Sequence, residues 1–397
     1  MNLAIPGSQV LDKPKPVAPI PKGIKYFHNL DALRFIAFLG VFLCHCIAVP
    51  GIIPQKRLIG EALQNFCFNG ARGVEMFFVI SGFIITYLLV SEKMQTGGIS
   101  LKNFYIRRTL RIWPLFYLII FYVFIVKPFL AHSFGIHWQF SFSDDYLANK
   151  PNPWLWLCFL GNFDIVFHGA PPQSELHLLW SLCVEEQFYL FWPIILKFIK
   201  IKQIPYALLC GVAISTACRI LFLVRWGGME SNFDTLILLD FFAIGGLLAY
   251  MINMKETETR HLVNTRVSWK LEWLFLGMVL FMIAFDTYAN KGLFETSFKY
   301  PFYAIVFSML ILSFEFKSNS IKRLKSNEIL SFLGKRSYGL YMFHMVVWTI
   351  LYSLLKNSYN LWVVALLTLA GTIILSSISY KFFEAPFLKL AKRFRRV

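Results

Sequence analysis

The stretch LDALRFIAFLGVFLCHCIAV, residues 30–49, decides the fold class of this chain, because it is apolar over the length of a membrane-spanning helix. About 20 such residues, rising about 1.5 Å each, cross the roughly 30 Å hydrocarbon core of a bilayer. Runs of similar length recur almost to the end of the chain. We therefore predict an all-α polytopic transmembrane helix bundle of about ten spans, at residues 30–49, 70–90, 112–131, 178–199, 205–224, 234–254, 271–288, 300–316, 338–356 and 361–381.

The composition agrees with a membrane domain. Of the 397 residues, 57% are hydrophobic and 15% are charged, whereas a soluble domain carries about 25% charged residues. We expect one membrane domain at residues 29–386 between two tails. Residues 1–28, rich in Pro and Lys and without a cleavable signal peptide, predict a disordered cytoplasmic tail, and residues 387–397 a basic cytoplasmic tail. We expect no further soluble domain.

The basic residues predict the orientation. With ten spans and both termini cytoplasmic, 28 Lys and Arg fall on the inner side and 9 on the outer side, as the positive-inside rule requires. The short apolar stretch 154–168 would reverse this distribution if it crossed, so we expect it to be re-entrant or to lie at the outer surface. The loop 132–177 is then the largest external element.

Neither the charge nor the cysteines indicate another class of protein. The net charge of +17 comes from residues between apolar runs rather than from one basic face, so we expect no nucleic-acid partner. The seven Cys show no metal or disulfide spacing. Cys44 and Cys46 flank His45 inside an apolar run, where they are more simply small packing residues, and we expect no metal site.

Ionisable residues inside spans are costly and mark functional sites. Arg34 and His45 are eleven residues apart in the first span, so they project from nearly one face of a helix, about 16 Å apart along its axis. Arg34 lies near the cytoplasmic end and His45 in the outer half. The structural alternative is that Arg34 reaches the inner interface beside Asp31 while His45 hydrogen-bonds a neighbouring helix.

Two adjacent carboxylates lie in the fourth span, HLLWSLCVEEQFYLFWP, residues 177–193. Glu185 and Glu186 diverge by about 100° on a helix, so only one can face a cavity shared with His45. Glu185 shares a stripe with Phe188 and Trp192, which predicts a helix–helix seam. We therefore expect Glu186 to face the cavity and to matter more for catalysis.

A third set of charges lies in FYIRRTLRIWP, residues 104–114. Arg107 and Arg111 are one helical turn apart, and Arg108 neighbours Arg111. Guanidinium groups in such a cluster bind phosphates through charge-assisted hydrogen bonds. Ordinary anchoring at the cytoplasmic interface is the alternative.

Taken together, these segments resemble the acyltransferase-3 family, the bacterial integral-membrane O-acyltransferases. The resemblance runs from Asp31 to Pro386, and the chain departs from the common pattern at Ala32, Cys183 and Glu75 without losing a proposed catalytic group. Six segments follow in the family's order: LDALRFIAFLGVFLCH (30–45), GVEMFFVISGFIIT (73–86), FYIRRTLRIWP (104–114), WSLCVEEQFYLFWP (180–193), GKRSYGLYMFHMVV (334–347) and SYKFFEAPF (379–387).

The resemblance implies transfer of an acyl group, often acetyl from acetyl-CoA, to hydroxyls of cell-envelope or secreted glycans across the bacterial cytoplasmic membrane. We expect acyl-CoA as co-substrate and no bound cofactor. The phosphates of coenzyme A would stay at the basic mouth while the pantetheine arm reaches His45. His45 would be the general base or the acyl acceptor, oriented by Glu185 or Glu186, with Arg34 along the arm. Further motif positions are Glu75, Ser81, Ser181, Tyr338, His344 and Glu384.

Two other classes of protein also bury polar groups in spans. A transporter would show inverted repeats or paired broken helices, and none is evident in the sequence. A purely structural protein or a receptor would not need Arg34, His45 and Glu186 inside spans. Cleavage of a thioester by the purified protein would separate both classes from an enzyme.

Overall fold

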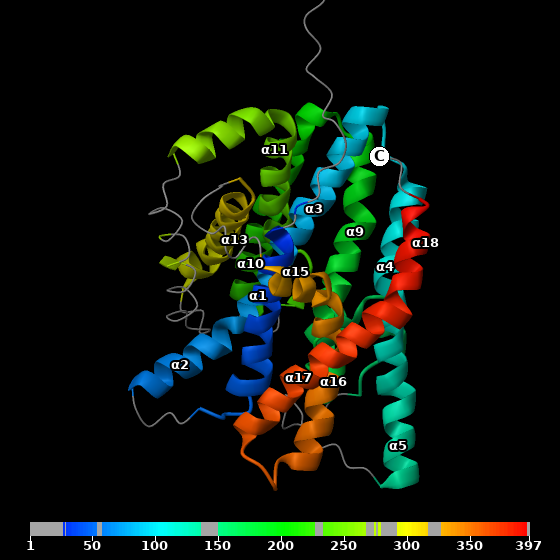
Figure 1. The fold of residues 1–397 in the computed structure, drawn as a ribbon. Coiled ribbons are helices and arrows are strands. Elements are labelled where there is room, and N and C mark those ends of the chain that lie inside the picture. Colours follow the sequence, from blue (N-terminus) through cyan, green and yellow to red (C-terminus); the bar gives the residue numbers. More distant parts are fainter. Residues whose placement is uncertain are drawn as a thin grey trace, which may run out of the picture.

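The computed structural model describes residues 27, 29–53, 58–135, 150–226, 233–266, 274, 277–278, 292–316 and 327–394. The described part is all-helical, as predicted, and forms one bundle (Figure 1). Seven continuous helical runs are long and apolar enough to cross a membrane. They are Asn29–Ala48, Gly60–Thr96, Leu101–Phe134, Ile201–Arg225, Ser297–Glu315, Ser337–Leu355 and Leu361–Lys392.

Two further long helices correspond to predicted spans. They are α9 (Trp180–Phe198), which carries the two glutamates, and α11 (Leu239–Arg266), whose second half is strongly charged. The predicted span 271–288 falls almost entirely outside the described residues, as do residues 1–26 of the predicted tail. Part of the predicted tail 387–397 is helical: its first residues belong to α18 (Ala385–Lys392), which packs along α4 (Leu101–Phe121).

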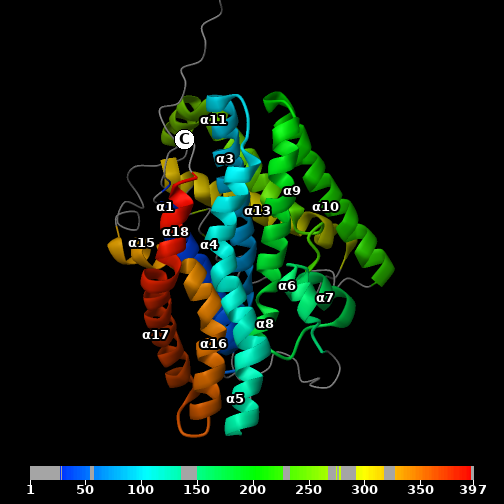
Figure 2. The same ribbon diagram turned by 90° about the vertical axis from the view of Figure 1, so that its right-hand side faces the viewer.

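The stretch 154–168 does not form a long helix. It contributes α6 (Pro153–Leu157) and α7 (Gly161–His168), two short helices held together by the Asp164 carboxylate. That carboxylate accepts hydrogen bonds from the Trp156 ring at 2.8 Å and from the Asn152 backbone at 3.0 Å. The short helices therefore agree with the prediction that residues 154–168 are not one of the ten spans. Figure 2 shows α6 and α7 beside α9.

The core of the bundle is built around α3 (Gly73–Thr96), which packs against α1 (Asn29–Leu43), α9 and α11. Its contact with α11 is close because small residues meet there. A Cβ at Gly82 would lie 2.1 Å from the Phe242 carbonyl oxygen, and one at Gly245 would lie 2.2 Å from that of Val79. Close backbone approach at small residues is typical of helix pairs in membranes.

The ends of the bundle differ. In Figure 1, the connection between α3 and α4 and the end of α9 lie at one end. α5 (Lys127–Phe134) and the turn between α16 (Ser337–Leu355) and α17 (Leu361–Ser379) lie at the other. The α3–α4 connection belongs to the side that the basic residues predict to be cytoplasmic, so the first end corresponds to that side.

Among the described residues, three π-helical turns interrupt or extend the long helices: η1 (Cys44–Ala48), η3 (Tyr122–Val126) and η6 (Tyr380–Glu384). π turns are rare in proteins, and those that do occur are often found at functional sites. Two of them carry predicted site residues, His45 in η1 and Glu384 in η6. The remaining described elements are the long helices α10 (Ile204–Trp226) and α13 (Leu293–Phe316) and five shorter ones: α2 (Leu58–Phe68), η2 (Asn69–Arg72), α8 (Ser174–His177), η4 (Ile201–Gln203) and α15 (Glu328–Lys335).

Candidate active site

A cavity lies inside the bundle between α1, α3, α4, α9 and α16; we call it the central cavity. It encloses about 800 Å³ of empty space, including solvent at its mouth. Thirteen residues were predicted for the functional site. Seven of them line this cavity: Arg34, Ser81, Arg108, Arg111, Ser181, Glu185 and Tyr338.

The guanidinium groups give the cavity a cationic lining. Arg108 and Arg111 project from α4, and Arg34 projects from α1. Arg34 also contacts Asp31 at 3.3 Å. Among the described residues, neither Arg108 nor Arg111 forms an ion pair, although the Arg108 guanidinium lies 5.4 Å from the ring centre of Tyr189. The cavity therefore presents two cations without a carboxylate partner.

Arg107 does not belong to this lining. It donates to the Phe394 carbonyl oxygen at 2.6 Å and lies 3.8 Å from the Glu92 carboxylate. These contacts tie the start of α4 to the C-terminal helix. Of the three predicted donor-binding arginines, the structure brings Arg108 and Arg111 into the cavity and leaves Arg107 outside it.

The orientation of the two adjacent glutamates is the reverse of the one predicted. Glu185 lines the cavity, where its carboxylate accepts hydrogen bonds from the hydroxyls of Ser81 and Tyr189. Glu186 turns towards α4 and accepts a hydrogen bond from the Trp113 indole at 2.9 Å. The stripe shared by Glu185, Phe188 and Trp192 was expected to be a helix–helix seam, but Glu185 lines the cavity.

His45 pairs with a second histidine. Its Nδ1 atom lies 3.0 Å from Nε2 of His344, and the two ring planes differ by only 6°. Nδ1 of His344 lies 2.6 Å from the Tyr341 carbonyl oxygen. The prediction that Glu185 or Glu186 orients His45 is therefore wrong for this structure: no hydrogen bond joins either carboxylate to His45, and His344 from α16 takes that place.

Tyr341 separates the histidine pair from the central cavity. Its ring centre is 5.7 Å from that of His344, and its side chain lines the cavity. Its hydroxyl contacts Ser181 Oγ at 2.8 Å and donates to the Leu178 carbonyl oxygen at 3.1 Å. Arg34 lines the cavity whereas His45 does not, although the two residues belong to one sequence motif.

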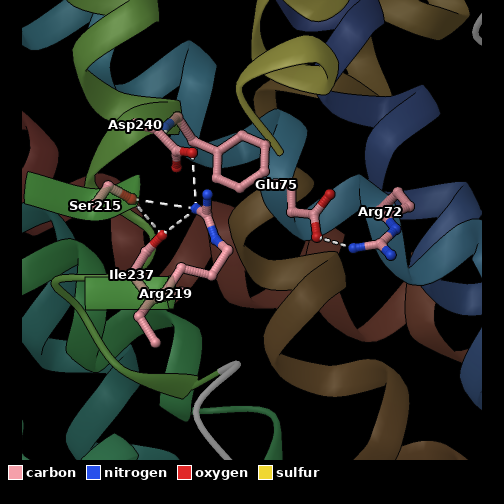
Figure 3. Close-up of polar contacts among 7 residues, drawn as sticks. Arg72, Glu75, Ser215, Arg219, Ile237 and Asp240 are labelled. Atoms are coloured by element: carbon pink, nitrogen blue, oxygen red, sulfur yellow. Dashed lines mark hydrogen bonds and ion pairs between the residues drawn. The ribbon is translucent and has the colours of Figure 1, made fainter. Parts of the chain in front are cut away.

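Glu75 lies outside the cavity in a buried pair with Arg72 (Figure 3). The guanidinium of Arg72 also lies 5.5 Å from the ring centre of Tyr300. The Arg219 guanidinium lies 4.4 Å from the same ring centre. Two arginines therefore share one aromatic ring.

Arg219 is compensated by its own carboxylate. It contacts Asp240 at 2.7 Å and the Ser215 hydroxyl at 3.2 Å, and it donates to the Ile237 carbonyl oxygen at 2.5 Å (Figure 3). We call Arg72, Glu75, Arg219 and Asp240 the paired-charge cluster. It joins η2 and α3 to α10 and α11, and its charges are balanced within the protein.

The remaining predicted positions have local structural partners. The Tyr338 hydroxyl donates to the Ile112 carbonyl oxygen at 2.7 Å, which ties α16 to α4 at the cavity wall. Glu384 accepts from the Ser379 hydroxyl at 3.2 Å across the π turn η6. Glu384 therefore does not reach the cavity.

Three residues of the site were missed from the sequence. Tyr189 and Tyr341 line the cavity, and each follows a predicted position at helical spacing, Glu185 by four residues and Tyr338 by three. That spacing was the available signal. His177 ends α8 within electrostatic reach of His45.

No group of three or more His, Cys, Asp or Glu residues within the described ranges has a geometry suited to a metal ion. The site therefore consists of a cationic cavity, a carboxylate with two hydroxyl partners, and a histidine pair beyond an aromatic ring. Together with the spans, these features define a multi-pass membrane protein with a polar site suited to an anionic ligand and proton transfer.

Comparison with known proteins identifies the family. The family profile described as "Acyltransferase domain" matches residues 27–381, and the chain belongs to the acyltransferase-3 family. A Staphylococcus aureus (strain COL) protein, named provisionally as an O-acetyltransferase, is 30% identical over 385 residues, covering 93% of this chain and 58% of the relative. No solved structure matches.

Two further relatives carry more specific names. The peptidoglycan O-acetyltransferase OatA of Listeria monocytogenes serovar 1/2a (strain EGD-e) is 27% identical over 393 residues, covering 92% of this chain and 56% of the relative. The O-acetyltransferase OatA of Staphylococcus aureus (strain NCTC 8325) is 26% identical over 377 residues, covering 92% and 58%. The chain thus spans a little over half the length of these curated relatives.

Proposed function

We propose that this chain is an integral-membrane O-acyltransferase of the bacterial cytoplasmic membrane. It transfers an acyl group, acetyl in the first instance, from cytoplasmic acyl-CoA to a hydroxyl of a cell-envelope or secreted glycan on the other side. The observation that carries the proposal is the central cavity, whose cationic lining by Arg108 and Arg111 is continuous with a polar wall next to the His45–His344 pair.

The donor end follows from charge. Coenzyme A carries several phosphate charges, and Arg108 and Arg111 offer guanidinium groups that form no ion pair with a carboxylate of the described residues, although Glu185 lines the same cavity. Guanidinium–phosphate contacts are charge-assisted and geometrically specific. With the nucleotide at these residues, the pantetheine arm extends along the cavity past Arg34 and Glu185 towards Tyr341.

The chemistry needs one base and support for the oxyanion. His45 accepts the proton of the acceptor hydroxyl as the oxygen attacks the thioester carbonyl. The new bond joins that oxygen to the carbonyl carbon, the carbon–sulfur bond breaks, and the proton passes from His45 to the departing thiolate. Arg34, on the donor side of Tyr341, stabilises the developing negative charge. Tyr341 must move aside for the thioester to reach His45.

The acceptor is proposed from the relatives and from the expected topology. One relative is named a peptidoglycan O-acetyltransferase, so a peptidoglycan hydroxyl is the first acceptor to test. α6, α7 and α8 lie in the loop expected to face outward, and they form the acceptor mouth in this proposal. His177, at the end of α8, lies within electrostatic reach of His45.

Turnover by the purified protein tests the proposal. The protein in lipid nanodiscs is incubated with radiolabelled acetyl-CoA, and free thiol is measured with and without muropeptides. We expect slow thioester cleavage that the acceptor accelerates, with label appearing in the muropeptides. Absence of cleavage above the level of His45→Ala would reject the enzyme assignment, whereas cleavage without transfer to muropeptides would reject only this acceptor.

Cysteine labelling tests the sidedness. In a variant without native Cys, Lys150→Cys should react with a membrane-impermeant thiol reagent added to intact cells. Its matched control is Lys102→Cys, equally exposed at the start of α4, which should react only after permeabilisation. The opposite pattern would invert the topology.

A further inference from the structure

The two histidines form a directional hydrogen-bonded chain. The Tyr341 carbonyl oxygen, His344 and His45 follow one another at 2.6 Å and 3.0 Å. The ring centres of His45 and His344 are 5.3 Å apart, and the ring planes differ by 6°. This separation is close to the 3.0 Å between the two nitrogens plus the distance from each nitrogen to its ring centre, so the rings meet edge to edge and nearly in one plane. The contact is therefore an in-plane N–H···N hydrogen bond.

The hydrogens along this chain follow from donor and acceptor rules. A carbonyl oxygen only accepts, so Nδ1 of His344 carries a hydrogen. In a neutral imidazole the other nitrogen is then an acceptor, which places a lone pair on Nε2 of His344. Nδ1 of His45 must donate to it. A neutral His45 consequently holds its own lone pair on Nε2.

The reverse direction would require His344 to be a doubly protonated cation. His344 is fully buried, and the ring of Phe38, also fully buried, packs edge-on against it at 5.8 Å. No carboxylate of the described residues contacts His344. Burial of an unpaired charge in such surroundings is costly, so His344 is neutral and the chain runs from His45 to Tyr341.

We propose that His344 is a positioning residue that holds His45 as the Nδ1–H tautomer and so makes Nε2 of His45 the proton acceptor. This inference rests on the proposed function. During transfer, the acceptor hydroxyl proton moves to Nε2 of His45 as the new carbon–oxygen bond forms. The same proton then leaves with the thiolate. The positive charge on His45 in between is stabilised by the lone pair on Nε2 of His344, which accepts the Nδ1–H hydrogen bond, where other acyl-transfer sites use a carboxylate.

A spectroscopic signature tests the tautomer directly. The full chain is labelled with ¹⁵N-histidine in nanodiscs, and the His45 signals are assigned by their loss in His45→Gln. Magic-angle-spinning NMR at neutral pH should show a protonated Nδ1 and an unprotonated Nε2 for His45. A protonated Nε2 with an unprotonated Nδ1 would overturn the proposal.

Two substitutions at the same position separate positioning from packing. His344→Phe fills the site but cannot accept a hydrogen bond, whereas the side-chain oxygen of His344→Gln can. We expect His344→Phe to lower kcat by about 100-fold, within the usual range of general-base effects, with the acetyl-CoA KM unchanged. The kcat of His344→Gln should be at least about tenfold higher than that of His344→Phe. Equal kcat in the two variants would overturn the proposal.

The controls keep the result interpretable. His132→Gln changes an exposed histidine of α5 and should leave kcat and the His45 signals unchanged. If His344→Phe does not fold, the NMR spectrum of the wild-type protein and the kcat of His344→Gln still test the proposal. The tautomer needs no turnover for its detection, so an inactive preparation with the predicted spectrum would count against the proposed function and leave this inference standing.

Discussion

The central cavity and the paired-charge cluster bury arginines in opposite ways. In the cavity, half-buried Arg108 and exposed Arg111 have no carboxylate partner among the described residues. In the cluster, the side chains of Arg219 and Asp240 are 3% and 0% exposed and contact each other at 2.7 Å. Both regions lie in helices long enough to span the membrane.

The difference indicates whether a charge inside the bundle stabilises the fold or is available to bind a ligand. A fully desolvated ion pair is retained when each charge has its partner, and removing one partner is strongly destabilising. Cations that line an open cavity without partners keep their capacity for an anionic ligand. Substitutions in the cavity should therefore change turnover or affinity, whereas substitutions in the cluster should change stability.

The largest expected effect is at the histidine pair. His45→Ala should lower transfer by about 10²–10⁴-fold, because it removes the general base, while the protein still inserts and melts normally in detergent. Radiolabelled acetyl transfer measures the rate. Cys46→Ala, one residue further along the same π turn, is the matched control and should keep its activity. Near-normal transfer by a well-expressed His45→Ala would remove His45 from the mechanism.

The cluster should respond next, through stability. Asp240→Asn leaves the buried Arg219 charge uncompensated, and breaking such a pair costs about 3–5 kcal/mol. The melting temperature in detergent should fall clearly, while the activity per folded molecule stays the same. The double variant Arg219→Met with Asp240→Leu removes both charges and should recover most of the lost stability. Normal melting of Asp240→Asn would mean that the pair is not structural.

Affinity for the donor should distinguish the three arginines of α4. Arg108→Gln with Arg111→Gln should raise the acetyl-CoA KM about 10–100-fold, because hydrogen bonds to charged groups contribute about 1.5–3 kcal/mol. Their melting temperature should not change. Arg107→Gln is the matched control, since Arg107 is held by Phe394 and Glu92 outside the cavity. An equal rise in KM for Arg107→Gln would leave only membrane anchoring as the role of this cluster.

The smallest expected effect separates the adjacent glutamates. Glu185→Gln perturbs a carboxylate that accepts from Ser81 and Tyr189 in the cavity wall and should lower kcat about tenfold, an effect of roughly 1.4 kcal/mol. Glu186→Gln keeps an oxygen for the Trp113 indole and should change kcat by less than about threefold. The sequence had predicted the reverse order. Turnover measurements that restore that order would show that the carboxylates exchange orientation during catalysis.

The sequence predicted many of the residues that form the site, but little of how their side chains are arranged. Arg34 was found because a charge inside an apolar run stands out, and Arg108 and Arg111 because they cluster at helical spacing before the third span; all three line the cavity. The exclusion of Arg107 was not predictable. It depends on contacts with the C-terminal helix, almost 300 residues away in the chain.

The sequence by itself determined the all-helical class and the positions of the spans, because hydropathy over about 20 residues decides whether a segment crosses a bilayer. It also identified the family. Only the tertiary structure decided that His45 meets His344, 299 residues later, and that Glu185 rather than Glu186 faces the cavity. A step of one residue turns a side chain by about 100°. The direction in which it points has meaning only once the neighbouring helices are in place.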